Sequence, residues 1–480
     1  MARNYSKKET YRQFKLRVID PISDTYCGAK WYNATIWLGH GQTTSCHHPP
    51  AHKIDIKEIE TNPSAIHNTQ HKKLMRKLML EGERPNECEY CWKVEDMGRD
   101  AVSDRVFKTH IYSDEDIKTS SEMPWDSDVT LKTLEISFER TCNFACTYCN
   151  PAFSTSWVRD IKKNGPYINI VSDGRGHFMD TAPWAESPKN EDDNPYIQAF
   201  WKWWESDLAD SLEEIRITGG EPLMDKNTHR VFDYILAAPK SDLHVDVTSN
   251  FSVEPELFNK YLDKVKQLCE GTRIEHFMQY VSLDTGIPEH ASYIRRGLNP
   301  SRVVDYTTRF LEEIPGRNSL TFIITMNNLS ILGLKRLLEE ILVLRKQYSS
   351  TYQRVWFDTP VLRTPSWQSL QILPESYTVI LADVVKYMKQ HQLKEGEQRF
   401  DGFKDYEIQR LERDLDWMKK GKKLSDKYLH EQRADFYRFF NEYDKRRGAT
   451  TKDARDETFV DVFPEMKEFW QECKYHAENT

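Results

Sequence analysis

At 480 residues the chain is too long for one small hydrophobic core, so we expect two or three domains. It contains no apolar run close to the roughly 20 residues that a membrane-spanning helix needs, and residues 1–9 lack the apolar stretch of a secretory signal. A net charge of −8 argues against a dominant nucleic-acid-binding surface. We therefore expect a cytoplasmic protein with no membrane segment and no nucleic-acid partner.

A first group of cysteines lies before residue 92. It consists of Cys27, Cys46, Cys88 and Cys91. Because thiols stay reduced in the cytosol, clustered cysteines there are more often metal ligands than disulfides. Four cysteines that end in a C-x2-C pair are a full ligand set for one metal centre, either structural zinc or an iron–sulfur cluster. We interpret the nearby His47, His48 and His52 as loop residues rather than ligands.

From residue 132 the sequence alternates between strand-like and helix-like patterns. Six β-rich segments are expected to be strands: 133–138, 214–218, 243–248, 278–283, 320–326 and 354–358. Amphipathic stretches such as 228–238 and 332–345 separate them and carry apolar residues at helical spacing. This alternation favours a parallel sheet with right-handed crossovers. We predict an α/β fold, a partial or open (β/α)6 TIM-type barrel, with function at the C-terminal ends of the strands.

A short loop with three cysteines follows the first of these strands. Cys142, Cys146 and Cys149 have the spacing C-x3-C-x2-C, and no fourth cysteine stands nearby. A [4Fe–4S] cluster has four irons and normally takes four thiolates, so three leave one iron open to a ligand that is not protein. Zinc is the weaker interpretation, because it prefers four closed ligands and paired C-x2-C spacings.

Other predicted strands also end in glycine-rich or polar turns. These turns hold Gly219–Glu221, then Ser249 and Asn250, then Ser282 and Asp284. Glycines let a backbone approach a ligand closely, and a carboxylate is the natural partner of a buried ammonium. The sequence therefore predicts that these residues and the cysteine loop lie at one edge of the sheet.

Two further segments complete the predicted organisation. Residues 154–210 form a long insertion, which we expect to be a lid or a substrate-facing loop whose aromatic run at 200–204 packs onto the barrel. After about residue 369 the pattern is helical, as at 406–420 and 427–447, with mixed charges that suit solvated helix faces. We predict three domains: an N-terminal metal-binding domain (1–125), the partial barrel (126–368) and a helical C-terminal extension (369–480).

The three-cysteine loop resembles the cluster motif of the radical S-adenosylmethionine (radical SAM) enzymes. The resemblance implies that Cys142, Cys146 and Cys149 hold a [4Fe–4S] cluster whose open iron is chelated by the amino and carboxylate groups of SAM. It further implies reductive cleavage of SAM to a 5′-deoxyadenosyl radical, which abstracts hydrogen from a substrate. An electron donor such as flavodoxin or ferredoxin belongs to this chemistry.

The same resemblance suggests residues that bind SAM. Tyr148 matches the aromatic residue that family members place beside the adenine. Gly219, Gly220 and Glu221 match the GGE motif, whose glycine turn and carboxylate receive the methionyl ammonium.

Three more strand-end features fit this pattern. Ser249 and Asn250 resemble the polar pair that hydrogen-bonds the ribose of SAM. Ser282 and Asp284 resemble the S-x-D strand end of the family. In the run Arg295-Arg296, one arginine resembles the residue that follows this strand end; it could pair with the SAM carboxylate or equally make a structural ion pair.

The N-terminal cysteines are similar to those of the SPASM and twitch extensions, which carry auxiliary [4Fe–4S] clusters. The likeness includes Gly41 between Cys27 and Cys46, although typical members have a second cysteine where this chain has His47. Segments 80–85, 88–99 and 463–466 fit a subgroup with an N-terminal twitch domain, so the resemblance covers nearly the whole chain. It favours a second [4Fe–4S] cluster over zinc at this site.

Three functions are compatible with these features. The resemblance favours an oxidoreductase or maturase that oxidises or cross-links a peptide or peptide-like substrate. One alternative is a radical SAM dehydrogenase or epimerase of a small molecule, with a structural auxiliary metal site. The other is a non-enzymatic iron–sulfur or zinc scaffold that binds a partner through the C-terminal helices, which leaves the GGE turn and the strand-end polar residues without a role.

Overall fold

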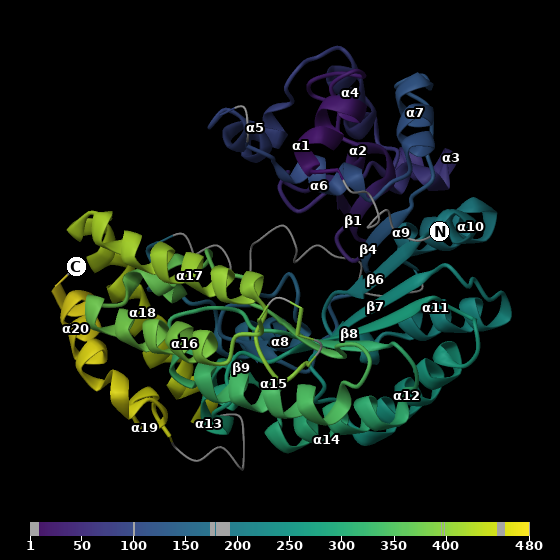
Figure 1. The fold of residues 1–480 in the computed structure, drawn as a ribbon. Coiled ribbons are helices and arrows are strands. Elements are labelled where there is room, and N and C mark those ends of the chain that lie inside the picture. Colours follow the sequence, from purple (N-terminus) through teal and green to yellow (C-terminus); the bar gives the residue numbers. More distant parts are fainter. Residues whose placement is uncertain are drawn as a thin grey trace. The chain divides into compact units, whose positions relative to one another are not determined.

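The computed structural model describes residues 9–98, 101–172, 178, 193–394, 396–397, 399–448 and 457–479. It shows a mixed α/β fold with many helices and a large, mostly parallel sheet (Figure 1). The chain divides into two compact units. The first comprises Met1–Glu139, Ser187–Gly219 and Lys240–Asp246, and the second comprises Arg140–Glu186, Gly220–Pro239 and Val247–Thr480. Within the described residues, no helix is both long and apolar enough to cross a membrane.

The first unit contains five strands of the sheet. They are β1 (Asn33–Trp37), β2 (Gln42–Thr44), β3 (His52–Lys53), β4 (Thr133–Ser137) and β6 (Glu214–Thr218). Their order is β6-β4-β1-β2-β3, with β6, β4 and β1 parallel and the last two pairs antiparallel. Ile136 of β4 lies opposite Ile36 of β1 and Ile217 of β6, and all three are fully buried. Such β-branched residues pack well on a pleated, buried surface.

Short helices surround these strands. They are α1 (Tyr11–Phe14), α2 (Ala29–Tyr32), α3 (Ile56–Thr61), α4 (Gln70–Leu80), α5 (Glu89–Glu95), α6 (Asp104–His110), α7 (Asp114–Glu122), α9 (Pro195–Trp203) and α10 (Ala209–Ser211). Their starts follow local sequence rules. Ser113 caps α7 by accepting a hydrogen bond from the backbone N–H of Asp116, whose carboxylate accepts one from Ser113 in return.

The second unit holds the other strands. They are β8 (His276–Ser282), β10 (Ser319–Ile323), β11 (Val355–Asp358) and the last residues of β7 (His244–Ser249), in the order β11-β10-β8-β7. The β8–β10 and β10–β11 pairs are parallel. A separate two-stranded antiparallel sheet joins β5 (Ala145–Cys146) to β9 (Arg295–Arg296).

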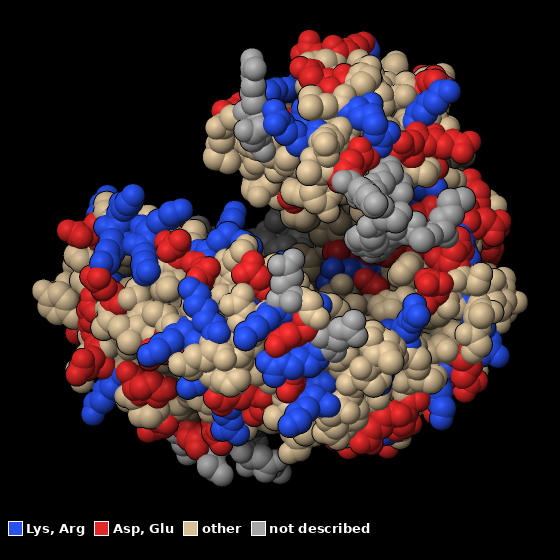
Figure 2. Space-filling view, viewed as in Figure 1, with Lys and Arg blue, Asp and Glu red and all other residues tan. Residues whose placement is uncertain are grey.

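Eleven helices of the second unit are described. They are α8 (Thr155–Asn164), α11 (Lys226–Ala237), α12 (Pro255–Cys269), α13 (Pro288–Ile294), α14 (Pro300–Glu313), α15 (Leu334–Tyr348), α16 (Thr378–Gln390), α17 (Asp405–Lys419), α18 (Asp426–Gly448), α19 (Phe459–Val462) and α20 (Lys467–Asn479). Helices α12 and α14 lie side by side (Figure 1), where the ring of Phe258 stacks on that of Tyr306 at 3.6 Å. Positive and negative side chains are interspersed over the face shown in Figure 2.

All six predicted strands are present, and each begins and ends within three residues of its predicted limits. The barrel is not confirmed, because no closed sheet is found among the described residues. Within the first unit, β1 pairs with β4 and is followed by the antiparallel strands β2 and β3, which extend the sheet. The sequence interpretation missed β1, whose pattern NATIW lies in the segment expected only to bind metal.

The predicted insertion at 154–210 contains α8 and α9, while its residues 173–177 and 179–192 lie outside the described residues. Its aromatic run packs within the first unit. The rings of Phe200 and Trp201 lie 5.1 and 5.9 Å from that of Phe138, directly after β4. Helices α16 to α20 lie in the segment 369–480, where the sequence pattern is helical.

Candidate active site

The three-cysteine loop is fixed to the start of α8 by hydrogen bonds. The backbone N–H of Cys142 donates to Thr155 Oγ1 (3.1 Å), and Ser156 Oγ donates to the carbonyl of Cys142 (2.8 Å). The indole N–H of Trp157 donates to the carbonyl of Cys146 (2.9 Å). Backbone groups that regular structure leaves unpaired are therefore satisfied, and the loop is held in one conformation.

The three thiols are reduced and largely enclosed. Cys142 and Cys146 are buried, and Cys149 is partly buried. Burial raises the pKa of each thiol, that of Cys149 to about 12. Neighbouring thiols raise the pKa of Cys142 and of Cys149 further, whereas Arg295 lowers that of Cys146. Their sulfurs do not all lie within 4.8 Å of one another, whereas a tetrahedral zinc ion with 2.3 Å bonds brings its sulfurs to about 3.8 Å.

An ion pair stands against the second cysteine. Arg295 donates from Nε and Nη2 to the two carboxylate oxygens of Asp284, at 2.9 Å each, and its Nη1 lies 3.9 Å from Cys146 Sγ. The Tyr148 hydroxyl donates to Asp284 Oδ2 (2.8 Å), and the backbone N–H of Thr325 donates to Oδ1 (2.9 Å). Asp284 thus accepts four hydrogen bonds, so it holds Tyr148 and Arg295 in place. Arg296 instead pairs with Asp160.

A second buried carboxylate lies near Cys142. Glu221 accepts hydrogen bonds from Ser249 Oγ and the backbone N–H of Asn250, both at 2.8 Å, and from the backbone N–H of Leu223 at 3.1 Å. These donors are neutral, and no cationic side chain forms an ion pair with Glu221 within the described part of the chain. Burial outweighs the hydrogen bonds and raises the pKa of Glu221 to about 7.

Glycine is required at positions 219 and 220, because neighbouring atoms leave no room for a Cβ there. A Cβ at Gly220 would lie 2.3 Å from the carbonyl oxygen of Thr141, to which the backbone N–H of Glu221 donates at 2.7 Å. Gly219 has φ of +130°, and a Cβ there would lie 2.7 Å from Ser137 Oγ. Gly220 therefore permits close backbone contact with the cysteine loop, and Gly219 permits close contact with the end of β4.

The predicted site residues fall into two connected sets. One set lies next to Cys146 and consists of Tyr148, Asp284 and Arg295. The other set consists of Ser249 and Asn250, which donate hydrogen bonds to Glu221. Asn143, which sequence reasoning missed, joins the loop to the second set, because it accepts a hydrogen bond from Asn250 Nδ2 at 2.8 Å. A single asparagine between two cysteines carries no pattern that could reveal this role. Ser282 ends β8 and is partly buried.

The four N-terminal cysteines line one pocket in the first unit. It is lined by Cys27, Cys46, Cys88 and Cys91 together with Lys30, His48, Asp104, Arg105 and Lys108, among other residues. Burial raises the pKa of Cys46, that of Cys88 to about 12 and that of Cys91 to about 11. No three of these sulfurs lie within 4.8 Å of one another, which is wider than tetrahedral zinc requires.

Cationic side chains, which sequence reasoning also missed, surround this pocket. Lys30 is buried and forms an ion pair with Glu87, the residue before Cys88. Arg105 is buried and pairs with Glu95 at 2.7 Å. Positive charge beside four thiols offsets the negative charge that they carry as metal ligands.

No protein-family model matches the chain. A GTP 3',8-cyclase from Aliarcobacter butzleri (strain RM4018) is 25% identical over 134 residues, which are 27% of this chain and 30% of the cyclase. The chain thus spans less than a third of that curated relative.

Solved structures of Streptococcus suis SuiB show a weak likeness. For SuiB bound to S-adenosylmethionine the TM-score is 0.31 at 13% identity, over 77% of this chain and 70% of that one. For SuiB bound to the precursor peptide SuiA the TM-score is 0.32 at 12% identity, over 75% and 69%. Scores this low carry no functional argument. The sequence match agrees with the radical SAM resemblance of the chain.

Proposed function

We propose that the chain is a radical SAM enzyme in which Cys142, Cys146 and Cys149 hold a [4Fe–4S] cluster with one open iron. The observation that carries the proposal is the loop of three enclosed, reduced thiols, which hydrogen bonds fix to the start of α8. The other two cysteines of this unit lie elsewhere, Cys269 at the end of α12 and Cys473 in α20. Three thiolates then leave one iron for SAM.

Glu221 supports a SAM pocket beside this loop. Its carboxylate is buried among neutral donors, so a cation that reaches it would relieve the cost of burying its charge. The methionyl ammonium of SAM is such a cation, and charge-assisted hydrogen bonds of this kind are strong. When bound, cluster and SAM together supply a 5′-deoxyadenosyl radical for hydrogen abstraction.

The remaining residues act by position and charge. Asn250 orients Glu221 and, through Asn143, ties it to the cysteine loop. Arg295 brings a positive charge to Cys146 and so favours the thiolate that a cluster requires. Asp284 fixes Arg295 and Tyr148, and in this proposal its role is to position them.

An auxiliary [4Fe–4S] cluster is our proposal for Cys27, Cys46, Cys88 and Cys91. It is supported by their common pocket and by the buried cations Lys30 and Arg105 that line it. Iron, sulfide and zinc should be counted on wild type and on a Cys88→Ala/Cys91→Ala variant. Loss of about four irons per chain supports the cluster. Unchanged iron with loss of zinc would establish the zinc alternative.

For the substrate we propose a peptide or peptide-like molecule that is oxidised or cross-linked, with flavodoxin or ferredoxin as the electron donor. The partial match to a GTP 3',8-cyclase favours a second candidate, a small molecule such as GTP. Incubation with GTP and, separately, with candidate peptides distinguishes the two, because a true substrate raises the yield of 5′-deoxyadenosine and is itself converted to a product that chromatography separates from it.

The radical SAM proposal is tested by anaerobic reconstitution with iron, sulfide, SAM and dithionite, followed by chromatography of 5′-deoxyadenosine. Wild type should form it, and Cys146→Ala should not. Cys269→Ala is the matched control, since it removes a thiol from the same unit but not from the loop. Product from Cys146→Ala at the wild-type rate would refute the proposal.

A further inference from the structure

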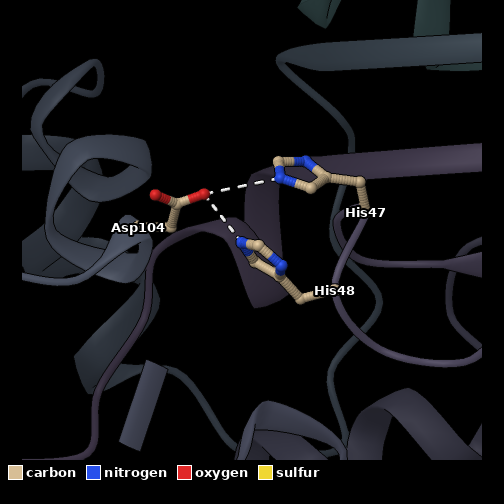
Figure 3. A group of neighbouring side chains, drawn as sticks. All are labelled: His47, His48 and Asp104. Carbon is tan, nitrogen blue, oxygen red and sulfur yellow. Dashed lines mark hydrogen bonds and ion pairs between the residues drawn. The ribbon is translucent and has the colours of Figure 1, made fainter. Parts of the chain in front are cut away.

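Three metal-ligating side chains meet at the edge of the four-cysteine pocket, and the proposed function uses none of them. Figure 3 shows His47 and His48, which follow Cys46 on one loop, both pointing toward Asp104 at the start of α6. His48 Nε2 lies 2.7 Å and His47 Nε2 3.4 Å from the same oxygen, Asp104 Oδ2. Within the described residues, this is the one group of three or more His, Cys, Asp or Glu ligand atoms that all lie within 4.8 Å of one another.

We propose that His47, His48 and Asp104 form a binding site for a divalent transition-metal ion of the zinc class, separate from the four-cysteine centre. Two imidazoles and one carboxylate are a ligand set that zinc takes when it keeps a fourth position open. This proposal departs from the sequence interpretation of His47 and His48 as loop residues.

The distances are close to those that a metal requires. In a tetrahedral zinc site with bonds of 2.0–2.2 Å, neighbouring ligand atoms lie about 3.4 Å apart. The separation of His47 Nε2 from Asp104 Oδ2 already has this value. The His48–Asp104 contact, now at hydrogen-bond length, would widen by about 0.7 Å, which a small rotation of one side chain provides.

One of the ligands, His48, is held in place before any metal binds. The ring of His48 stacks on Tyr90 with centroids 3.8 Å apart and planes inclined by 14°. Tyr90 lies on α5 between Cys88 and Cys91. His48 and Asp104 also line the pocket with Cys46. A metal here would tie the loop that carries Cys46 to α6, and so hold this cysteine at the pocket.

The alternative is a pair of histidines that only hydrogen-bond to Asp104. To separate the two, the reconstituted holoprotein is dialysed against a slight excess of Zn²⁺ and then metal-free buffer, and bound zinc is counted. Wild type should retain about one zinc per chain, and Asp104→Asn, which preserves shape and hydrogen bonding, should lose most of it. His430→Ala is the matched control, because His430 stacks on His476 at 4.0 Å in the second unit.

Zinc K-edge X-ray absorption on the wild-type holoprotein gives a second, independent answer. The site predicts nitrogen and oxygen neighbours at about 2.0–2.2 Å and no sulfur at about 2.3 Å. Equal zinc in wild type and Asp104→Asn, or sulfur in the zinc shell, would overturn the proposal. Neither measurement depends on 5′-deoxyadenosine formation. Failure of the metal-site proposal is therefore distinct from failure of the proposed enzyme activity.

Discussion

Arg295 reaches both oxygens of Asp284 and at the same time approaches the sulfur of Cys146. The sequence left this arginine two roles, a partner of the SAM carboxylate or a structural ion pair. Two of its nitrogens donate hydrogen bonds to Asp284, and the third approaches the thiol of Cys146. Arg295 therefore couples the end of β8 to the cysteine loop, and its first role is to position the loop and to set its charge.

Arg295→Gln should destabilise the fold, because it leaves the buried Asp284 carboxylate without its cation. Removing one partner of a buried ion pair typically costs about 3–5 kcal/mol. Chemical denaturation measures the loss. Arg302→Gln is the control, since it breaks a similar two-pronged pair with the solvent-exposed Glu254 and should change stability little. Equal effects of both substitutions would contradict the account.

Glu221 should make stability fall as pH rises, in the absence of SAM. Its pKa is raised from 4.5 to about 7, so between these values the folded state holds a proton that the unfolded state has released. This contribution to the free energy of unfolding is fully present below pH 4.5 and is lost as pH rises through 7. The free energy of unfolding falls by about 3 kcal/mol over this range. The difference between wild type and Glu221→Gln, followed by denaturation at several pH values, isolates this effect. A constant difference across the range would argue against a buried, protonated Glu221.

Gly220→Ala should disturb the cysteine loop. Its Cβ would meet the carbonyl oxygen of Thr141 at 2.3 Å, and both groups are backbone-anchored. Overpacking of this kind costs about 1–3 kcal/mol, and the iron bound by the three-cysteine loop should fall with it. Gly271→Ala serves as control: it has φ of +69° but no atom within 4 Å of the new Cβ, so it adds strain of about 1 kcal/mol without touching the loop. Iron counts on both variants check the prediction.

Lys30→Met should lower the midpoint potential of the proposed auxiliary cluster. The ammonium is buried in the four-cysteine pocket, where its charge favours the more negative, reduced state of a cluster. Potentiometric titration followed by electron paramagnetic resonance measures the shift. Lys77→Met, on the surface of α4, should leave the potential unchanged. A potential that does not move in Lys30→Met would exclude an electrostatic role for this residue.

The strands were predictable where β-rich segments alternate with amphipathic helices. β4, β6, β7, β8, β10 and β11 all lie in such segments. Strand β1 was not predicted, because five residues without a helical partner carry no such alternation. Closure of the sheet was not predictable either, since it depends on which strands pair at the ends and not on any local pattern.

The sequence pointed to candidate ligands but not to the residues that hold them in place. Cysteine spacing and strand-end polarity pointed to Cys146, Glu221 and Asp284. The roles of Asn143 and Lys30 were not predicted, because a lone polar residue has no periodicity. Its role arises only when distant segments of the chain meet.

The measurement that tests the central claim most directly is 5′-deoxyadenosine formation by the anaerobically reconstituted protein with SAM and dithionite. The account predicts product from wild type and from Cys269→Ala, and none above background from Cys146→Ala. Absence of product from wild type that carries a full [4Fe–4S] complement, or undiminished product from Cys146→Ala, would contradict it.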